Sequence, residues 1–577
     1  MSTRRGVLAF VVVAVALGTA FFLAALALRR PLARSSSAPA VLVFDVPAVL
    51  DEGPLPPRPF PFGRTRRSRL TVYDVTHALR RAAEDEHVGG LVLHIGTLDW
   101  GGAMGAVARA AGAAGRRAGK PVFASLAGGG EREYLLASAA GRIGMPPTAD
   151  LRLDGLSATA TYFRGTFDKL GIAPNFVYVG RFKSGVEPYT RTGMSPDARL
   201  ALARVLDGLY GVLVDSLAAA RHMTPDSVRR LVDGGPYVAA EARERGLVDT
   251  LLYAAEMDTL ALRRGARRLP TMPLGRYASD LARVRGGPRV ALVTATGTIV
   301  GGRSRERPGE DVALGSETLV EALRQARLKR SIKAIVLRID SPGGVAQASD
   351  DIWREVERCR AAKPVIVSMS DVAASGGYYI AVAADSIVAE PATLTGSIGV
   401  YGGKLNVLGL YRKLGLNVEI MSRGRHAEML SPFRDFTDEE ARVFRHGLES
   451  FYRGFVARVA RGRRLPEAVV DSLAEGRVWC GLDALPLGLV DRLGGIETAF
   501  AMARDKAGFP VDEELVVERF PRIQRSFLER WLEDLLTDDD GAADLAMLPP
   551  LLRTWRAVAG YPAGTAMALM PYSIEVR

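Results

Sequence analysis

The feature that most constrains the fold of this chain is an internal duplication. Residues 78–96 (ALRRAAEDEHVGGLVLHIG) resemble residues 322–340 (ALRQARLKRSIKAIVLRID), and residues 120–127 (KPVFASLA) resemble residues 363–370 (KPVIVSMS). Three further pairs of segments follow in the same order: 133–140 with 377–384, 179–199 with 422–442, and 246–251 with 488–493. Because these landmarks recur in one order with nearly constant spacing, we predict two copies of a single domain.

Each copy alternates short apolar runs with longer amphipathic stretches. LVLHI and PVFASL in the first copy correspond to AIVLRI and PVIVSM in the second, and amphipathic stretches include 316–327 and 437–461. Short, fully apolar runs separated by helices are typical of parallel strands with crossover helices. We therefore predict an α/β fold in duplicate, with repeats at 38–261 and 288–507.

Three segments lie outside the two repeats. Residues 262–287 are rich in Arg, Gly and Pro and are predicted to form a linker, while the periodic pattern lapses in an extension over 508–577. Residues 6–28 carry no charge, and a helix of that length spans a bilayer core of about 30 Å. A cleaved signal peptide would have a shorter apolar region. We therefore expect residues 1–37 to be an uncleaved membrane anchor and tether.

Composition narrows the functional class. The chain has 577 residues, 48% of them hydrophobic and 24% charged, which excludes wholesale disorder. Two cysteines, Cys359 and Cys480, are too few for a disulfide framework or a cysteine-rich zinc module. The net charge of +12 comes from arginines spread along the chain rather than gathered in a stripe, so we expect no nucleic-acid partner. The usual metal and nucleotide motifs do not occur in the sequence, and we expect no cofactor.

Two segments of the second copy could carry chemistry. Residues 338–344 (RIDSPGG) follow an apolar strand, and a Pro-Gly-Gly turn there leaves backbone N–H groups unpaired, as an anion hole requires. A plain tight turn is the alternative. Residues 371–379 (DVAASGGYY) place Ser375 between small neighbours at the start of an apolar helix, where the helix dipole favours developing negative charge. An ordinary N-cap serine has the same pattern.

The first copy lacks both of these features. It has residues 97–100 (TLDW) in place of the Pro-Gly-Gly turn, and Glu131 or Arg132 in place of Ser375. Conversely, Lys183 of the first copy is opposite His426 of the second. Each copy therefore holds what the other lacks.

Lys183 is a candidate base for Ser375. A serine hydroxyl is a poor nucleophile until a base takes its proton, and a lysine made neutral by burial can do so, whereas an arginine cannot. Arginine fills 67 of the 76 basic positions, so a lysine within RFKS (181–184) is unusual in this chain and suggests a specific role. Two alternatives stay open on the residues alone: Lys183 is an ordinary exposed lysine, or His426 is the base within one copy.

The chain resembles the long, duplicated form of bacterial signal peptide peptidase A, also called protease IV. The matching segments are RFKSGVEPYTRTGMSP, RIDSPGG, AASGGYY and LTGSIGV (394–400), together with the paired GLVD ends. The resemblance implies two tandem crotonase-like (Clp-protease-like) domains behind an N-terminal membrane helix, and an oligomeric bowl, expected to be a tetramer. The site residues that it implies are Ser375 as nucleophile, Lys183 as general base, Gly376 with Gly343 or Gly344 for the oxyanion hole, and Ser184 as a candidate for orienting the lysine.

The expected function is that of a membrane-anchored serine endopeptidase. It would degrade cleaved signal peptides and other apolar peptide segments through an acyl-enzyme, with no metal or cofactor. We expect the chain in the inner membrane, held through residues 6–28, with its catalytic domains on the periplasmic, extracytoplasmic side. Two rival classes stay open: a crotonase-type acyl-CoA enzyme, and a non-catalytic membrane scaffold.

Overall fold

The structure is a computed structural model, and it describes most of the two repeats. The described residues are 39–53, 70–99, 101, 103–116, 119–264, 267–282, 286–305, 312–511, 513–521 and 564–570. The predicted membrane segment at 6–28 lies outside them. Within the described ranges, none of the helices has the length and apolar character needed to cross a bilayer.

The first repeat is built on a parallel sheet of six strands. The strand order is β11-β1-β2-β3-β4-β8, and every neighbouring pair is parallel. Helices α2, α3 and α4 cover one face, and α10 packs against the other, so that the strands are apolar on both faces. The bounds are β1 Ala40–Val46, β2 Val88–Ile95, β3 Val122–Leu126, β4 Arg142–Met145, β8 Thr250–Leu251, β11 Thr271–Pro273, α2 Val72–Glu84, α3 Ala103–Arg116, α4 Glu131–Ala137 and α10 Ala254–Leu262.

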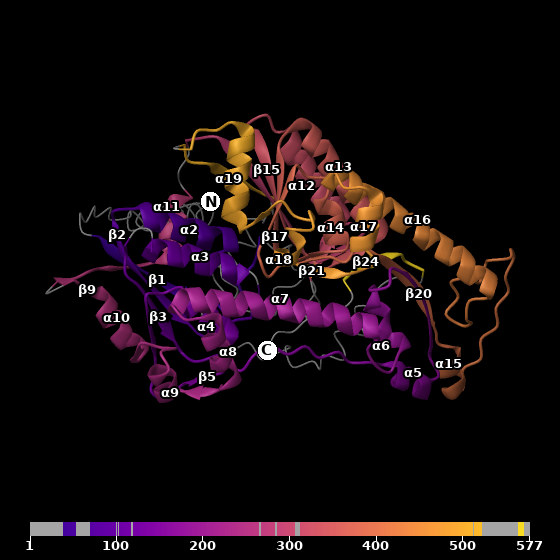
Figure 1. Ribbon diagram of the computed structural model, residues 1–577. Coiled ribbons are helices and arrows are strands. Elements are labelled where there is room, and N and C mark those ends of the chain that lie inside the picture. Colours follow the sequence, from indigo (N-terminus) through magenta and orange to yellow (C-terminus); the bar gives the residue numbers. More distant parts are fainter. Residues whose placement is uncertain are drawn as a thin grey trace, which may run out of the picture.

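The second repeat has the same plan. Its sheet runs β21-β19-β17-β15-β12-β23, with β18 pairing β17 and β22. Helices α12, α13 and α14 cover one face and α19 covers the other (Figure 1). The bounds are β12 Arg289–Thr296, β15 Ile332–Ser341, β17 Val365–Ala374, β18 Ser386–Ala389, β19 Leu394–Gly396, β21 Val478–Cys480, β22 Arg492–Leu493, β23 Val516–Phe520, α12 Ser316–Leu328, α13 Ala346–Ala362, α14 Gly376–Ala381 and α19 Ile496–Ala507.

Matching contacts in the two repeats reflect the duplication. The hydroxyl of Tyr134 donates to the carbonyl of Leu247 at 2.7 Å. In the second repeat, the hydroxyl of Tyr378 donates to the carbonyl of Leu489 at 2.8 Å. Both tyrosines lie in the short helix that follows the third strand, in chain order, of the main sheet of their repeat. Two further pairs of contacts repeat in the same way: Arg221 with Asp249 and Arg463 with Asp491, and Lys120 with Ala82 and Lys363 with Ala326.

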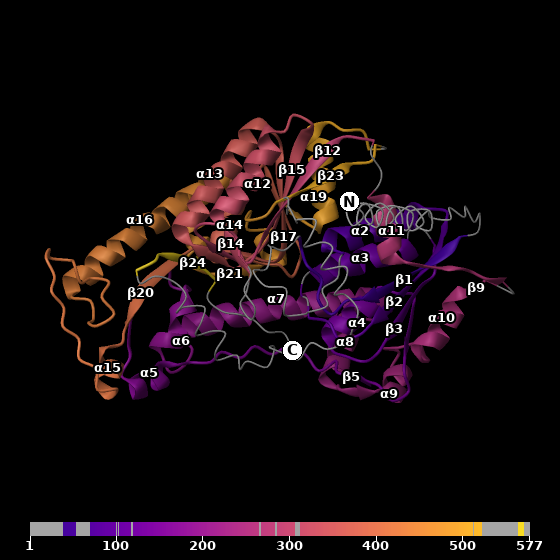
Figure 2. The ribbon, with the colours of Figure 1, turned by 180° about the vertical axis from the view of Figure 1, so that it is seen from behind.

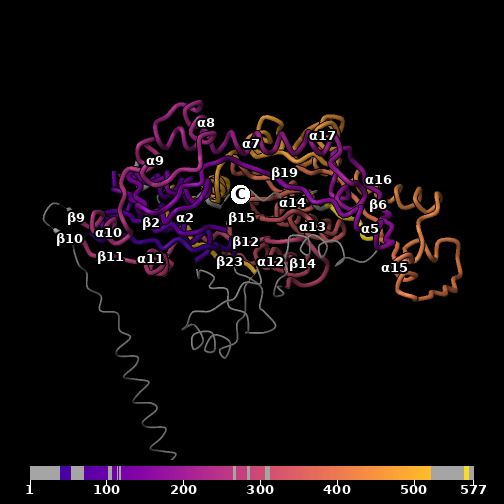
Figure 3. Tube along the Cα trace, turned by 90° about the horizontal axis from the view of Figure 1, so that it is seen from below, coloured from indigo at the N-terminus to yellow at the C-terminus, as the bar shows by residue number. Residues whose placement is uncertain are grey.

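Two long helices extend from the repeats. α7 (Pro196–Arg221) begins at the N-cap Ser195, and α16 (Asp438–Arg463) begins at the capping box of Thr437. α7 runs from the first repeat across the underside of the second, as Figures 1 and 3 show. The remaining elements are α5 Arg164–Leu170, α6 Glu187–Thr190, α8 Pro225–Asp233, α9 Ala239–Glu244, α11 Leu274–Leu281, α15 Leu408–Lys413, α17 Glu467–Leu473, α18 Gly481–Ala484, η1 Ser184–Val186, β5 Asp150–Leu151, β7 Tyr237–Val238, β9 Arg263–Arg264 and β10 Arg267–Arg268.

A second six-stranded sheet joins the repeats. Its order is β14-β13-β16-β24-β20-β6. β6 belongs to the first repeat, and it pairs with β20 of the second along seven consecutive residues, in antiparallel register from Val179–Val400 to Ala173–Asn406. The repeats are therefore interleaved rather than set side by side. The bounds are β14 Ala313–Gly315, β13 Thr298–Val300, β16 Gly343–Val345, β24 Met567–Leu569, β20 Val400–Asn406 and β6 Ala173–Val179.

The two segments predicted to lie outside the repeats contribute to their sheets. Within 262–287, expected to be a linker, β11 pairs with β1 and α11 packs on α2, because Leu269, Leu274 and Tyr277 are buried in the first repeat. Within the extension after 507, β23 pairs with β12, and its Phe520 is almost wholly buried. The Arg-, Gly- and Pro-rich composition of the first segment, and the lapse of periodicity in the second, gave no sign of the few apolar residues that anchor them.

Candidate active site

Ser375 lies at a sharp turn between a strand and a helix. It follows β17 and is the N-cap of α14. Its φ of 52° and ψ of −112° are a backbone conformation that residues with a Cβ rarely adopt. Its N–H donates to the carbonyl of Gly396 at 2.8 Å, which ties the turn to β19. The next residues must be small, since a Cβ on Gly377 would lie 2.6 Å from the carbonyl oxygen of Ser341. The turn presents the hydroxyl at the N-terminus of α14.

Lys183 reaches Ser375 from the other repeat. It follows β6 by four residues, and the pairing of β6 with β20 carries it to the beginning of β20. Its Nζ lies 2.8 Å from Ser375 Oγ, and both side chains are 0% exposed. The structure therefore brings together the two side chains that the sequence singled out, one from each repeat.

The Lys183 side chain packs directly against two glycines, Gly399 and Gly476. A Cβ on Gly476 would lie 2.6 Å from Lys183 Cβ, and a Cβ on Gly399 would lie 3.1 Å from Lys183 Cδ, so the stem fits only because these positions carry no side chain. Burial at this position lowers the pKa of the Lys183 amine well below its ordinary value, because the charged form loses its hydration.

Ser397, rather than Ser184, holds the lysine amine. Lys183 Nζ donates to the carbonyl oxygen and to the hydroxyl of Ser397, each at 2.9 Å. Ser184 Oγ is buried, and it has no hydrogen-bond partner among the described residues. Ser397 lies within LTGSIGV, a segment noted in the sequence for its resemblance alone. Its φ of 50° is a further signal that only the structure supplies.

The glycine turn of β16 lies beside Ser375. The N–H of Gly343 donates to Ser341 Oγ at 3.2 Å, and that hydroxyl donates to the carbonyl of Gly297 at 2.7 Å. The amide of Gly343 is therefore already used, which favours Gly344 as the second oxyanion donor. Gly376 is the first residue of α14, and an N–H at that position has no partner within its own helix. The glycine turn lies beside it, since a Cβ on Gly376 would be 3.1 Å from Gly343 Cα.

Neither His426 nor the matching position of the first repeat offers a second site. His426 Nε2 lies 3.9 Å from Glu439 Oε1 rather than beside Ser375. In the first repeat, Glu131 lies at the start of α4, and its carboxylate accepts from the amides of Asp154 (2.9 Å) and Gly155 (2.7 Å). The first repeat keeps the scaffold and uses this position for structure.

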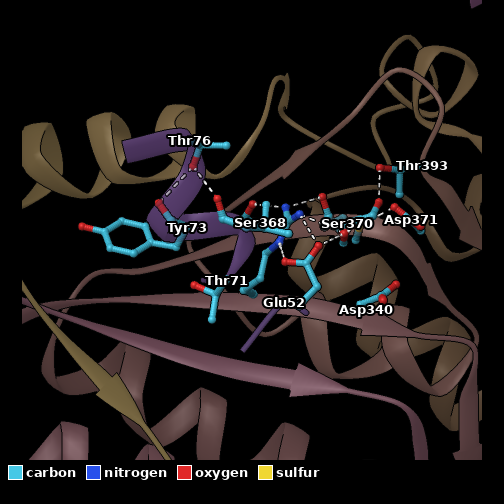
Figure 4. A network of polar contacts seen from close by, with 12 residues as sticks. Glu52, Thr71, Tyr73, Thr76, Asp340, Ser368, Ser370, Asp371 and Thr393 are labelled. Carbon is cyan, nitrogen blue, oxygen red and sulfur yellow. Dashed lines mark hydrogen bonds and ion pairs between the residues drawn. The ribbon is translucent and has the colours of Figure 1, made fainter. Parts of the chain in front are cut away.

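A buried ion pair joins the two repeats beside strands β15 and β17. Arg338, on β15 before the glycine turn, holds Glu52 of the first repeat with two hydrogen bonds of 2.7 and 2.8 Å. The same guanidinium donates to Ser368 and Ser370 on β17, and Figure 4 shows Glu52 between the repeats next to these serines. Burial, together with the charges of Asp371 and Glu52, raises the pKa of Asp340 well above its ordinary value.

Comparisons with known proteins find a peptidase family and serine protease relatives. The model of peptidase family S49 matches residues 114–262 and 357–509, once in each repeat. The chain is 34% identical over 469 residues to the chloroplastic serine protease SPPA of Arabidopsis thaliana, covering 79% of this chain and 68% of that protein. It is 33% identical over 459 residues to protease 4 of Salmonella typhi, covering 77% and 73%.

Similarity to solved structures is weaker. A variant of the 1510-N membrane-bound stomatin-specific protease with a substrate peptide matches 44% of this chain and 99% of that one, with 14% identity and a TM-score of 0.26.

The duplicated α/β fold and the sequence relatives define a serine peptidase. The chain belongs to peptidase family S49. This membership confirms the duplication and the resemblance to protease IV. It leaves the acyl-CoA enzyme and the non-catalytic scaffold without support.

Proposed function

We propose that this chain is a membrane-anchored endopeptidase in which Ser375 is the nucleophile and Lys183 the general base. The observation that carries the proposal is the 2.8 Å contact between Lys183 Nζ and Ser375 Oγ, made by two fully buried side chains. Burial lowers the pKa of the amine, and an uncharged amine has a lone pair that can accept a proton.

The hydrogen-bond partners of Lys183 support its role as a base, because they match the N–H bonds and the lone pair of a neutral amine. A neutral amine has two N–H bonds and one lone pair. The carbonyl and hydroxyl oxygens of Ser397, each 2.9 Å away, can accept both N–H bonds. The lone pair then faces the Ser375 hydroxyl, which donates to it. Ser397 thus acts as a positioning residue for the base.

Peptide cleavage follows in two stages. Ser375 Oγ attacks the scissile carbonyl while Lys183 takes the hydroxyl proton, and the amides of Gly344 and Gly376 stabilise the oxyanion. Lys183 passes that proton to the leaving amine as the C–N bond breaks, which leaves an acyl-enzyme. Water, deprotonated by Lys183, then attacks the ester and releases the new carboxylate, and Ser375 regains its proton.

Extended apolar peptides, including cleaved signal peptides, are the substrates that we propose. An extended substrate would pair with β16 in the place that β24 holds in this structure. Val186, Tyr401 and the partly buried Val345 form an apolar cluster around Met567 of β24. A substrate that takes the place of β24 would bring an apolar side chain to this cluster.

The proposal is tested by removing either member of the pair. Ser375→Ala and Lys183→Ala should each lower kcat for a fluorogenic apolar peptide by a factor of about 10³ or more, with an unchanged circular dichroism spectrum. Lys169→Ala, which truncates an exposed lysine of α5, is the matched control and should keep wild-type activity. A Lys183→Ala enzyme with full kcat would refute the pair.

We also propose that residues 6–28 anchor the chain in the inner membrane, with the repeats on the extracytoplasmic side. The uncharged run of these residues supports this part. Deleting residues 1–37 should move the chain from the membrane fraction to the soluble fraction, and protease added to spheroplasts should digest the wild-type repeats. We further propose a homo-oligomer, a tetramer, which light scattering of the detergent-solubilised chain measures directly.

A further inference from the structure

A short hairpin at one end of the first repeat carries four arginines. Its strands β9 and β10 are antiparallel, and their register pairs arginine with arginine at both positions, Arg263 with Arg268 and Arg264 with Arg267. Figures 1 and 2 show β9 projecting beyond α10, at the end of the molecule opposite to α15. Like charges directly opposite one another destabilise a strand pair, so this arrangement works against the hairpin's own stability.

The charges at the base of the hairpin have no carboxylate partner. Arg263 and Arg268 are exposed, and neither forms an ion pair with any of the residues that the structure describes. The acidic residue of α10 nearest to them in sequence is Asp258, and its carboxylate is hydrogen-bonded to His94 Nε2 at 2.7 Å. Exposed guanidinium groups that face each other favour an external anion, and their planar set of N–H donors suits a phosphate group.

The hairpin has a fixed place on the first repeat, because its base is part of the apolar core. Leu262 and Leu269, which precede and follow the two strands, are almost wholly buried with Val41 of β1. The N–H of Leu269 donates to the carbonyl of Leu262 at 2.9 Å and closes the base. The arginines are therefore presented from a set position at the edge of the repeat.

This position is where the chain arrives from the predicted membrane anchor. The N–H of Val41 in β1 donates to the carbonyl of Pro270 at 2.9 Å, and Pro270 follows β10 by two residues. In the sequence, residues 29–38 connect the uncharged run 6–28 to β1, and a segment of that length spans at most about 35 Å. An anchor at residues 6–28 would therefore keep the hairpin within reach of the bilayer surface, at a high effective concentration.

We infer that the β9–β10 hairpin docks on the anionic phospholipid headgroups of the membrane that holds residues 6–28. This inference rests on the membrane anchoring in the proposed function. A single anchor fixes where the chain meets the bilayer but not which face of the repeats turns toward it, whereas a polybasic patch supplies a second contact. Because β6 and β20 interleave the two repeats, docking at this one hairpin orients both of them over the membrane.

Quenching of a fluorescent label by spin-labelled lipid headgroups tests the inference on the full chain in nanodiscs. Cys359 and Cys480 are buried, so Thr271→Cys, at an exposed position three residues beyond β10, takes the label selectively. The label should be quenched in nanodiscs rich in phosphatidylglycerol. It should be quenched little in pure phosphatidylcholine, or in about 1 M salt, where the Debye length is about 3 Å.

Two failures are distinguishable in this experiment. A chain that does not enter nanodiscs of either lipid overturns the proposed anchor and the inference with it. A chain that enters both but is quenched equally in the two lipids overturns the inference alone. That second result would assign the arginines to protecting the strand edges or to an acidic protein partner.

A pair of variants matched in net charge tests the hairpin itself. Each arginine near an anionic lipid surface raises the ratio of bound to free hairpin about fivefold. Changing all four hairpin arginines to glutamine should therefore remove at least nine-tenths of the quenching that depends on phosphatidylglycerol. The control changes four exposed arginines of α15 and α16 to glutamine and should keep the quenching: Arg412, Arg442, Arg445 and Arg453. Equal quenching of the two variants would contradict docking through the hairpin.

Discussion

At the scale of single residues, the site depends on two serines held in left-handed backbone conformations. Ser375 (φ 52°) aims its hydroxyl at the lysine, and Ser397 (φ 50°) aims both of its oxygens there. Each such residue costs on the order of 1–3 kcal/mol, so the surrounding strands must hold it in place. Burial of Lys183 adds a third unfavourable contribution to the free energy of folding, because its amine loses its hydration.

The burial of the Lys183 amine predicts how the free energy of unfolding varies with pH. The folded chain keeps the pKa of Lys183 well below that of the unfolded chain, about 10.4. Between the two values the unfolded state binds more protons, so folding becomes more favourable as pH rises, by up to about 1.4 kcal/mol per pH unit. Below the folded pKa both states bind the proton, and the slope vanishes. The free energy of unfolding of wild type minus that of Lys183→Met should therefore rise toward pH 10.

Urea unfolding of both chains at several pH values measures this difference. Lys169→Met, at an exposed lysine, is the control for the substitution itself. A difference between wild type and Lys183→Met that stays flat from pH 6 to pH 10 would show that the amine is charged in the folded chain, and it would count against Lys183 as a neutral base.

At the scale of secondary-structure elements, two strand pairings define the site. The antiparallel pairing of β6 with β20 delivers Lys183 to Ser375, although 192 residues separate them in the sequence. The pairing of β24 with β16 and β20 then covers the same site. One sheet therefore both assembles the pair and holds a peptide against it.

Removal of β24 should open the site to external peptides. A chain that ends at Pro562 loses the strand, and a tethered segment competes at an effective concentration of the order of millimolar. We expect KM for an apolar peptide to fall about tenfold or more relative to the chain that keeps β24, with kcat little changed. Steady-state kinetics measures both. An unchanged KM would mean that β24 does not occupy the position of the substrate.

At the scale of the whole molecule, one buried ion pair ties the repeats together. Arg338 and Glu52 are almost wholly buried, and they are joined by two hydrogen bonds across the interface between the repeats. Apolar contact adds to this link, since Tyr73 of α2 packs on Phe500 of α19 with ring centroids 5.1 Å apart. The relative position of the repeats decides whether Lys183 meets Ser375.

Loss of one partner should therefore destabilise the chain strongly. Glu52→Ala leaves the Arg338 charge buried and unpaired, which costs about 3–5 kcal/mol of unfolding free energy. The double variant Glu52→Leu with Arg338→Met removes both charges and should recover most of that loss. Asp226→Ala, which breaks an exposed pair with Arg229, should change stability by less than about 1 kcal/mol. Chemical denaturation checks all three, and a Glu52→Ala chain as stable as the Asp226→Ala chain would contradict the role of the pair.

Much of the fold and part of the site could be predicted because the signals are local. Apolar runs such as 334–339 indicate buried parallel strands wherever they occur, and the turn around Ser375 needs small residues that are visible in the sequence. The orienting residue was different: Ser184 is next to Lys183 in the sequence, but Ser397 contacts the amine. A neighbour in the sequence is therefore a poor guide to which residue contacts the end of a long side chain such as that of Lys183.

The sequence by itself determined the duplicated α/β fold. It also determined that the first repeat has no serine at the position of Ser375 and that the second has no lysine at the position of Lys183. Those properties follow from periodicity and residue type, which each stretch of chain carries alone. Only the tertiary structure decided that β6 pairs with β20, that Ser397 holds the amine, and that β24 lies on the glycine turn. Pairings between distant strands depend on which apolar faces can be buried together, and that choice is made by the whole chain at once.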